Sequence, residues 1–310
     1  MDGITFICIF GASKTAMASK NLKWFYLLSL ALVWGSSFIL IKKGLVGLSA
    51  LQVGSLRTVF AALFLLLVGL PSLRKVGRKH WKWILLSGFF GTFFPAYLFA
   101  FAETEIDSAI VSILNSTTPL LSMLLGIFLF GNRFVHRKFT GVIIGLIGTG
   151  ALILSGAVVN PGQNYWYALL VILASLFYGF NANIIKQHLQ ELPALAITTG
   201  NFMVILLPAL AVLSWTGFFS PEVLHSEETG MSLLYVALLG ILGTGVALVV
   251  FNKLIQISDP VFSTSVTYLV PIVALGWGYL DGEDFTIVQL FSGLIILLGV
   301  IIVNTSRKTE

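Results

Sequence analysis

The chain of 310 residues is 57% hydrophobic and only 10% charged, whereas soluble domains carry about 25% charged residues. This composition predicts an integral membrane protein and excludes an ordinary soluble fold. The net charge of +5 is explained by basic residues gathered on one side of a membrane rather than by nucleic-acid binding. The single cysteine, Cys8, excludes a disulfide within the chain and a cysteine metal cluster.

Residues 1–21 are expected to form a tail outside the fold. An apolar run from Ile4 to Phe10 follows Asp2 rather than basic residues, which fits a signal peptide poorly. Met17 opens a second possible start. Residues 1–16 are therefore expected to be either a non-native upstream extension or a disordered tail.

Ten apolar stretches follow, each close to the roughly 20 residues that a helix needs to cross about 30 Å of hydrocarbon. In chain order they cover residues 24–41, 51–73, 83–102, 108–131, 139–158, 166–185, 195–217, 232–255, 261–280 and 287–303. The sequence thus predicts an all-α membrane protein with ten transmembrane helices.

The basic residues predict how these spans are oriented. With the amino terminus in the cytoplasm, fifteen Lys and Arg residues fall in cytoplasmic segments, while Lys42 and Lys43 fall outside and Arg57 lies within a span. Because cytoplasmic loops are enriched in Lys and Arg, we expect both termini to be cytoplasmic.

The chain contains two related halves. A shift of 144 residues aligns Gly35 with Gly179 and Lys42 with Lys186, and a shift of 152 aligns Gly88 with Gly240, Gly91 with Gly243, Phe99 with Phe251, Asp107 with Asp259 and Pro119 with Pro271. The unit holds five spans, an odd number, so its second copy enters the membrane upside down. We expect inverted repeats over residues 22–158 and 159–304, followed by a cytoplasmic tail, 305–310. Such repeats are typical of transporters.

The fourth and ninth spans carry polar residues on one helical face. These are Ser112, Asn115, Ser116 and Pro119 in the fourth span, and Thr264, Thr267, Tyr268 and Pro271 in the ninth. Each central proline frees the carbonyl four residues earlier, which must find a partner in a protein-lined or watery cavity. Close helix packing through Ser and Thr is the alternative interpretation.

The first and sixth spans add a second pair of faces. Trp34 and Ser37 match Tyr178 and Asn181 under the shift of 144. The two aromatic side chains can stack on a planar or cationic substrate, or they can fill the core. Asn201 should face protein or water, since an unpaired amide in hydrocarbon is costly. Tyr97, in the third span, completes the candidate substrate-binding residues.

Arg57 is the one basic residue deep within a span, and Glu103 is its nearest candidate partner. The pair is either structural, with Arg57 snorkelling toward the interface, or Arg57 recognises an anion or gates the outer mouth. With no Asp or Glu expected near a midplane, Glu103 is also the candidate proton relay. Asn201 occupies the position of Arg57 in the second half.

Small residues mark the fifth and tenth spans. Gly141 and Gly145 lie in the fifth, and Ser292, Gly293 and Gly299 lie in the tenth. Because small residues let helix backbones approach closely, these spans are expected to form a packing scaffold. A homodimer through the same two spans is a further arrangement that this pattern allows.

These features together resemble the EamA family of the drug/metabolite transporter superfamily. The resemblance covers Leu22 to Val303 and rests on the order of Trp34-Gly35-Ser36-Ser37-Phe38, the early Arg57, the prolines of the fourth and ninth spans, and Leu280-Asp281-Gly282-Glu283. One departure is visible: the family often closes its fourth span with Gly-Glu, whereas this chain has Gly131-Asn132-Arg133.

The resemblance implies a secondary transporter of the bacterial inner membrane that moves a small amino acid-like, amphipathic or drug-like metabolite by alternating access, with export expected. Uptake or exchange of nucleotide sugars or phosphorylated compounds is an alternative, which several basic residues in the cavity would favour. A channel or a membrane enzyme is another, although no His or Cys falls within a predicted span to build a catalytic site. A small-molecule substrate and lipid are the expected partners, without nucleic acid, cofactor or metal.

Overall fold

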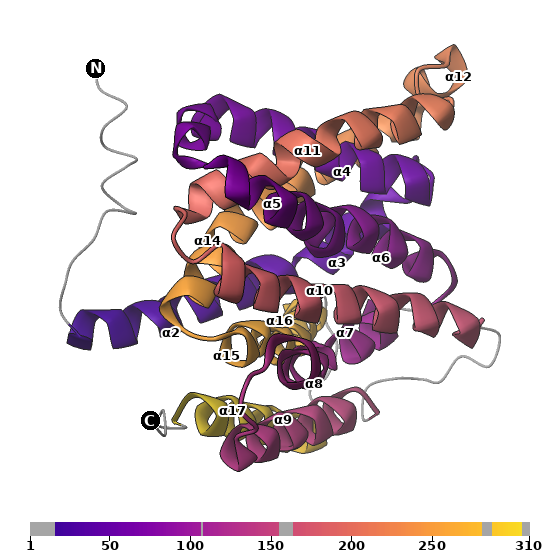
Figure 1. Cartoon of the computed structure of the whole chain (residues 1–310). Coiled ribbons are helices and arrows are strands. Elements are labelled where there is room, and N and C mark those ends of the chain that lie inside the picture. The colour runs from indigo at the N-terminus through magenta and orange to yellow at the C-terminus, as the bar shows by residue number, and fades with distance from the viewer. Residues whose placement is uncertain (1–15, 107, 155–163, 281–286, 306–310) are drawn as a thin grey trace.

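The computed structural model describes residues 16–106, 108–154, 164–280 and 287–305, and every regular element in these ranges is helical. Figure 1 shows the helices packed as a bundle in which most of them run across the view. The prediction of an all-α protein is therefore confirmed for the residues described. The resembling segment Leu280-Asp281-Gly282-Glu283 falls largely outside them.

The first half of the chain contains two long helices that are interrupted and one that changes its winding. Its elements are α2 (Ala16–Gly35), α3 (Ser37–Gly44), α4 (Ala50–Gly69), η1 (Leu70–Lys75), η2 (Arg78–His80), α5 (Trp81–Gly88), η3 (Phe89–Phe93), α6 (Phe94–Glu105), α7 (Ser108–Asn115), α8 (Thr118–Phe130) and α9 (His136–Leu154). The segment η3 is π-helical. The helix α2 begins eight residues before the expected start of the first span at Trp24.

The second half follows a similar order but differs in detail. Its elements are η4 (Tyr165–Tyr167), α10 (Ala168–His188), α11 (Ala194–Trp215), α12 (Pro221–Leu224), α13 (Glu227–Leu238), η5 (Leu239–Val246), α14 (Ala247–Ile257), α15 (Pro260–Thr264), α16 (Val266–Leu280) and α17 (Ile287–Thr305). The segment η5 is again π-helical. However, α10 is continuous, whereas its counterpart is broken at Ser36 into α2 and α3.

Several helical segments have the length and composition of membrane spans. Six qualify among the described residues: Asn21–Gly44, Ala50–Lys75, Arg78–Glu105, Ala168–His188, Ala194–Trp215 and Glu227–Ile257. Shorter apolar helices cover Thr118–Phe130, Pro260–Val273 and Phe291–Val303. Six helical segments of the described residues are thus long and apolar enough to cross a bilayer.

Short polar signals set where helices begin and end. Ser49 and Gln52 form a capping box at the start of α4, with Gln52 Oε1 accepting from the Ser49 amide at 2.9 Å. Asp259 caps α15 by accepting from the Phe262 amide at 3.1 Å. Gly131 ends α8 at φ +66°, a left-handed conformation that glycine adopts without steric cost.

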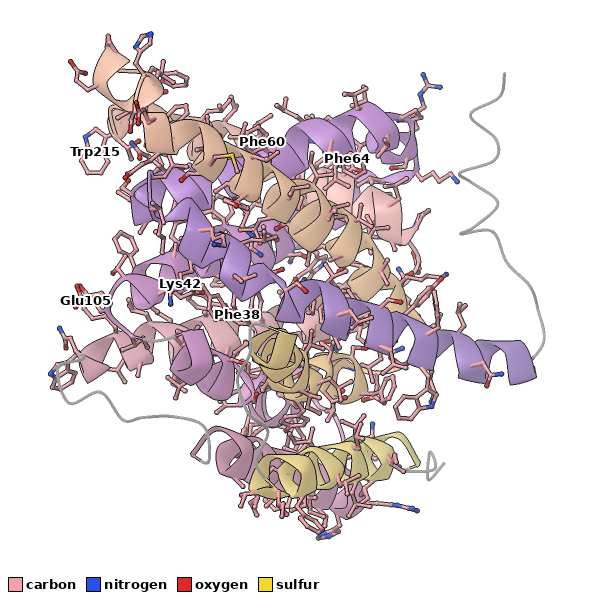
Figure 2. The ribbon with its side chains drawn as sticks, turned by 180° about the vertical axis from the view of Figure 1, so that it is seen from behind. Phe38, Lys42, Phe60, Phe64, Glu105 and Trp215 are labelled. Carbon is pink, nitrogen blue, oxygen red and sulfur yellow. The ribbon has the colours of Figure 1, made fainter. Side chains whose placement is uncertain are left out.

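The bundle has two distinct ends. The start of α2 and the end of α17 lie on one side, at the left in Figure 1; we call this the inner end. Lys42 and Glu105 lie at the opposite side, at the left in the reversed view of Figure 2; we call this the outer end.

Helix contacts in the first half recur in the second. The contact of α2 with α16 corresponds to that of α10 with α8, and the contact of α4 with η5 corresponds to that of α11 with η3 and α5. Two retained glycines make these contacts possible. A Cβ on Gly240 would lie 2.8 Å from the Arg57 carbonyl oxygen, and one on Gly88 would lie 3.0 Å from the Asn201 carbonyl oxygen. The repeated sequence positions therefore make equivalent backbone contacts.

The helices α9 and α17 lie side by side at one edge of the bundle (Figure 1). A Cβ on Gly299 would come 2.6 Å from the Gly145 amide nitrogen, and one on Gly141 would come 2.9 Å from the Gly299 carbonyl oxygen. These glycines are thus used within the chain, where they bring two backbones into contact.

Gly299→Ala is expected to destabilise the protein by about 1–3 kcal/mol, because the added methyl group forces the two packed backbones apart. Gly293→Ala on the same helix is the matched control, since a Cβ there meets nothing within 4 Å. The midpoint of thermal unfolding in detergent should fall for Gly299→Ala alone. Equal midpoints for the two variants would contradict the close contact of α9 and α17.

Candidate functional site

A central cavity lies between helices from both halves of the chain. The space that it offers to a water-sized molecule is about 80 Å³. Apolar, aromatic, hydroxyl and amide side chains line it together with one guanidinium group. The lining residues are Trp34, Ser37, Phe38, Ile41, Arg57, Gly91, Thr92, Phe99, Asn115, Thr118, Tyr178, Asn181, Gly243, Thr244, Leu248, Phe251, Thr264, Val266, Thr267 and Val270.

The cavity gathers half of the residues that the sequence pointed to. These are Trp34, Ser37, Arg57, Asn115, Tyr178, Asn181, Thr264 and Thr267. They come from seven helices: α2, α3, α4 and α7 of the first half and α10, α15 and α16 of the second. Residues that are far apart in sequence thus meet in one wall.

Two aromatic pairs occupy equivalent places in the wall. Trp34 packs on Phe251 with ring centroids 5.1 Å apart, and Tyr178 stacks on Phe99 at 5.8 Å. Trp34 Nε1 also donates to the Gly243 carbonyl at 2.9 Å. Each aromatic side chain therefore packs against another ring and also lines the cavity.

Ser37 and Asn181 lie beside glycines of the two π-helical segments. A Cβ on Gly243 would come 2.8 Å from Ser37 Oγ, and one on Gly91 would overlap the Asn181 amide. Asn181 is only 4% exposed, and its Oδ1 has no hydrogen-bond partner among the residues that the structure describes. Because a buried unpaired amide is costly, this side chain can gain a hydrogen bond from a bound molecule or a water.

Arg57 is fixed by a hydrogen bond that the sequence analysis did not foresee. Its Nε donates to Thr244 Oγ1 at 2.7 Å, and Thr244 Oγ1 donates to the Leu239 carbonyl at 3.0 Å. Glu103, the partner expected from sequence, interacts with Arg57 electrostatically and does not line the cavity. Thr244 matches Thr92 under the shift of 152, and this retained Thr was the available signal.

At the break in the fourth span, a neighbouring side chain bonds the carbonyl that the proline leaves free. Pro119 has no amide to bond the Asn115 carbonyl, and the helix stops at Asn115 and resumes at Thr118. Thr118 Oγ1 donates to that carbonyl at 2.6 Å. The group that the proline leaves free is thus satisfied at the cavity wall.

The ninth span breaks at a different place than expected. The interruption lies at Ser265, between α15 and α16, while Pro271 lies inside α16. Ser265 Oγ donates to the Phe262 carbonyl at 2.6 Å, and such local bonds compete with helical ones. The Thr267 carbonyl, which Pro271 leaves free, accepts from Ser116 Oγ at 3.1 Å. Ser116 therefore joins the two interrupted helices and does not line the cavity.

Four more expected binding residues lie elsewhere. The hydroxyl of Tyr97 is 2.9 Å from Ser55 Oγ, and the Tyr268 hydroxyl donates to the Val142 carbonyl at 3.1 Å. The Asn201 amide lies 3.0 Å from Ser87 Oγ, and Ser112 is buried away from the cavity. All four side chains are buried, but they pack against neighbouring helices and not against the cavity.

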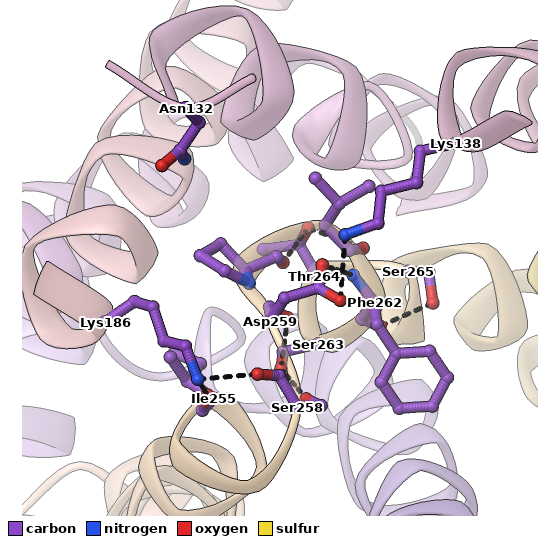
Figure 3. A network of polar contacts seen from close by, with 12 residues as sticks. Asn132, Lys138, Lys186, Ile255, Ser258, Asp259, Phe262, Ser263, Thr264 and Ser265 are labelled. Atoms are coloured by element: carbon purple, nitrogen blue, oxygen red, sulfur yellow. Dashed lines mark hydrogen bonds and ion pairs between the residues drawn. The ribbon is translucent and has the colours of Figure 1, made fainter. Parts of the chain in front are cut away.

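The inner end is closed by a network of polar contacts (Figure 3). Lys186 Nζ donates to the carbonyls of Ile255, Gln256 and Ser258 at 3.2, 3.3 and 2.6 Å. Lys138 forms an ion pair with Asp259 at 3.0 Å. These contacts join α10 and α9 to the connection between α14 and α15 on the inner side of the cavity.

Asn132 stands where the resembling family often has Glu, and it takes part in the same closure. Its Nδ2 donates to Asn183 Oδ1 at 3.1 Å, and Asn183 Nδ2 donates to the carbonyls of Ser122 and Gly179, both at 2.8 Å. An amide can act as both donor and acceptor in such a chain. In this protein the end of the fourth span is therefore held by a neutral hydrogen bond.

No group of three or more metal-ligating side chains occurs among the described residues. The cavity wall offers aromatic rings, hydroxyls and amides. A cavity between two related halves of a helical bundle is typical of membrane transporters.

The chain belongs to the EamA-like transporter family, whose model matches residues 22–154 and 165–305. It is thus a multi-pass protein of the inner membrane and a transporter of small metabolites. The family resemblance drawn from the sequence is confirmed.

Individual relatives are similar over most of their length. A probable amino-acid metabolite efflux pump of Salmonella typhimurium is 27% identical over 90% of this chain and 93% of its own. The uncharacterized inner membrane transporter YedA of Escherichia coli is 27% identical over 91% and 90%. A solved crystal structure aligns with a TM-score of 0.71 at 16% identity, covering 93% of this chain and 96% of its own, and it shows the shared fold.

Thr244→Val is expected to destabilise the protein by about 1–2 kcal/mol, because it leaves Arg57 Nε without its acceptor. Thr140→Val is the matched control: Thr140 is exposed, and its hydroxyl bonds only to the His136 carbonyl of its own helix. Thermal unfolding of the purified proteins measures the difference. A Thr244→Val variant as stable as the control would show that Arg57 does not depend on this bond.

Proposed function

We propose that this transporter exports small amphipathic metabolites of the amino-acid type by alternating access. The observation that carries the proposal is the cavity between the two halves, whose aromatic pairs suit a planar or apolar body and whose amides and hydroxyls suit polar groups. The name of the Salmonella relative, a probable amino-acid metabolite efflux pump, points to the same substrate class. Drug-like molecules of similar shape fall within it.

We further propose ten transmembrane helices arranged as inverted repeats over residues 22–158 and 159–304, with both termini cytoplasmic. The paired glycine contacts and the two π-helical segments support the duplication. The start of α2 and the end of α17 lie at the same end of the bundle, as this topology requires. The inner end is then the cytoplasmic one.

The closed inner end supports alternating access. Lys186, Asn132 and the Lys138–Asp259 pair hold helices together on the inner side of the cavity. The cavity reaches Ile41, in the last turn of α3 toward the outer end. We therefore interpret this conformation as outward-facing, with one side sealed while the other gives access.

Phosphorylated substrates and nucleotide sugars are the less favoured alternative. Among the described lining residues Arg57 is the one cation, and it already bonds Thr244 and interacts with Glu103. A doubly charged phosphate would need more positive charge than this wall supplies. Glu103 stays the candidate for a proton relay.

Purified protein in liposomes should give saturable flux of an amphipathic amino acid. Asn115→Ala is expected to raise the half-saturating concentration about two- to tenfold, the effect of losing one hydrogen bond to the substrate. Trp34→Ala should also reduce flux, because it removes an aromatic face of the cavity. Initial rates measured against concentration test both variants.

Ser112→Ala is the matched control, since Ser112 lies on the same helix as Asn115 but outside the cavity. All three variants must remain folded, as judged by gel filtration. Flux that is unchanged in both cavity variants would discard the site, and flux that never saturates would indicate a channel.

A reporter fused after Lys308 is expected to be cytoplasmic, because the basic residues place both termini on that side. A pair of fusions with opposite requirements, alkaline phosphatase and green fluorescent protein, measures this in cells. Phosphatase activity with a dark fluorescent fusion would overturn the topology.

A further inference from the structure

Two lysines related by the internal repeat differ in their hydrogen bonding. Lys186, in the last turn of α10, uses its ammonium group to bind three carbonyls at the end of α14. An ammonium has three donors, one for each carbonyl. Its positive charge also meets the partial negative charge at the carboxyl end of a helix. This contact closes the inner end.

The same acceptors exist at the outer end. Under the shift of 152, the carbonyls that bind Lys186 correspond to those of Glu103, Thr104 and Ile106, at the end of α6. The two helix ends close with the same hydrogen bond. The Ile106 amide donates to the Ala102 carbonyl at 3.0 Å, as the Ser258 amide donates to the Leu254 carbonyl at 3.0 Å. Both caps have φ −131°, while ψ is 148° at Ile106 and −131° at Ser258, so the two cap carbonyls point in different directions.

The matching donor is present but is not engaged. Lys42 corresponds to Lys186 under the shift of 144 and lies in the last turn of α3. It is exposed at the outer end, where Figure 2 also places Glu105. Within the described ranges, the Lys42 ammonium makes no hydrogen bond or ion pair.

The helices that carry the two lysines differ in continuity. The helix of the engaged lysine, α10, is continuous, whereas the helix of the disengaged one is broken at Ser36 into α2 and α3. A break in the middle of a span lets its outer part take a different direction from its inner part. The short helix α3 can therefore move toward α6 without moving α2.

We propose that Lys42 is the outer gating residue, whose ammonium binds the carbonyls of Glu103, Thr104 and Ile106 when the outer end closes. Lys186 releases its own three carbonyls in the same step, so each lysine stabilises one of two conformations. This inference rests on the proposed alternating access. It assigns to Lys42 a role that its exposed position in the outward-facing conformation conceals.

The two lysines are then expected to act in opposite directions on one equilibrium. Losing the Lys42 contact weakens the inward-facing conformation and leaves more protein open to the outside. Losing the Lys186 contact weakens the outward-facing conformation. A lysine that merely supported the fold would not change outside access in the direction opposite to its counterpart.

Access from the outside can be measured on a single cysteine. The reporter is Ser37→Cys in a Cys8→Ser background, because Ser37 lines the cavity. A membrane-impermeant maleimide applied to right-side-out vesicles labels it when the outer end is open. Lys42→Met should raise the labelling rate about twofold or more, and Lys186→Met should lower it by a similar factor.

Two control variants test whether the loss of the Lys42 ammonium causes the change in labelling rate. Lys42→Arg keeps a cation with several donors and should label like the parent. Lys43→Met removes the neighbouring exposed lysine, which lies 5.9 Å from the Tyr235 ring, and should also label like the parent. Since Lys42 is exposed, its variants are expected to fold, and Lys42→Gln repeats the test with a neutral polar side chain.

Labelling of Lys42→Met and Lys42→Gln at the parent rate, or a shift in the same direction as Lys186→Met, would overturn the gate. The labelling needs no substrate, so its outcome does not depend on the proposed substrate class. Opposite shifts without flux of amphipathic amino acids would fault that class alone. Saturable flux without opposite shifts would fault the gate alone.

Discussion

Backbone carbonyls that a helix leaves unpaired determine how this protein is built. In hydrocarbon such groups have no water to bond, so each must find a donor within the chain. Pro119 and Pro271 each leave a carbonyl free, and these carbonyls accept hydrogen bonds from Thr118 and Ser116. Two carbonyls of the π-helical segment η5 accept hydrogen bonds from Trp34 and Thr244. Polar side chains gather at the cavity because the irregular backbone gathers there, so the polar cavity wall and the helix breaks have one origin.

The duplication explains why the irregularities occur in pairs. Glycines at matched positions let α4 approach η5 and let α11 approach α5, and in both cases the close contact is made to a backbone carbonyl. A contact of this kind tolerates no added methyl group, so its glycine is fixed in both copies. Side chains that face the cavity are under no such constraint. Ser37 and Asn181 occupy equivalent places beside matched glycines, yet they differ in size and in hydrogen-bonding capacity.

The sequence contained the helices, the repeat and about half of the candidate site. Periodicity assigned Asn115, Thr267 and Asn181 to inward faces, and these residues do line the cavity. Tyr97 and Tyr268 are also among the binding residues that the sequence suggests, but their hydroxyls bond to neighbouring helices. A helical face predicts burial and does not say which neighbour is met. The bond between Arg57 and Thr244 joins residues 187 positions apart in sequence, and the π-helical winding that places Thr244 has no reliable signature in a single sequence.

Residues at matched positions of the two halves are most alike where they contact the backbone of another helix. They are least alike where they line the cavity or lie at an end of the bundle. A symmetric chain would hold its inner and outer ends equally well and would have no preferred state. Here the inner end has gained Asn132, Asn183 and the Lys138–Asp259 pair in addition to its lysine, so the closed inner end is held by more contacts than one lysine provides. If Lys42 is the main closing contact at the outer end, the protein without substrate favours the outward-facing conformation. A substrate that binds from the inside must then offset the free-energy difference between the two conformations through its own contacts with the cavity.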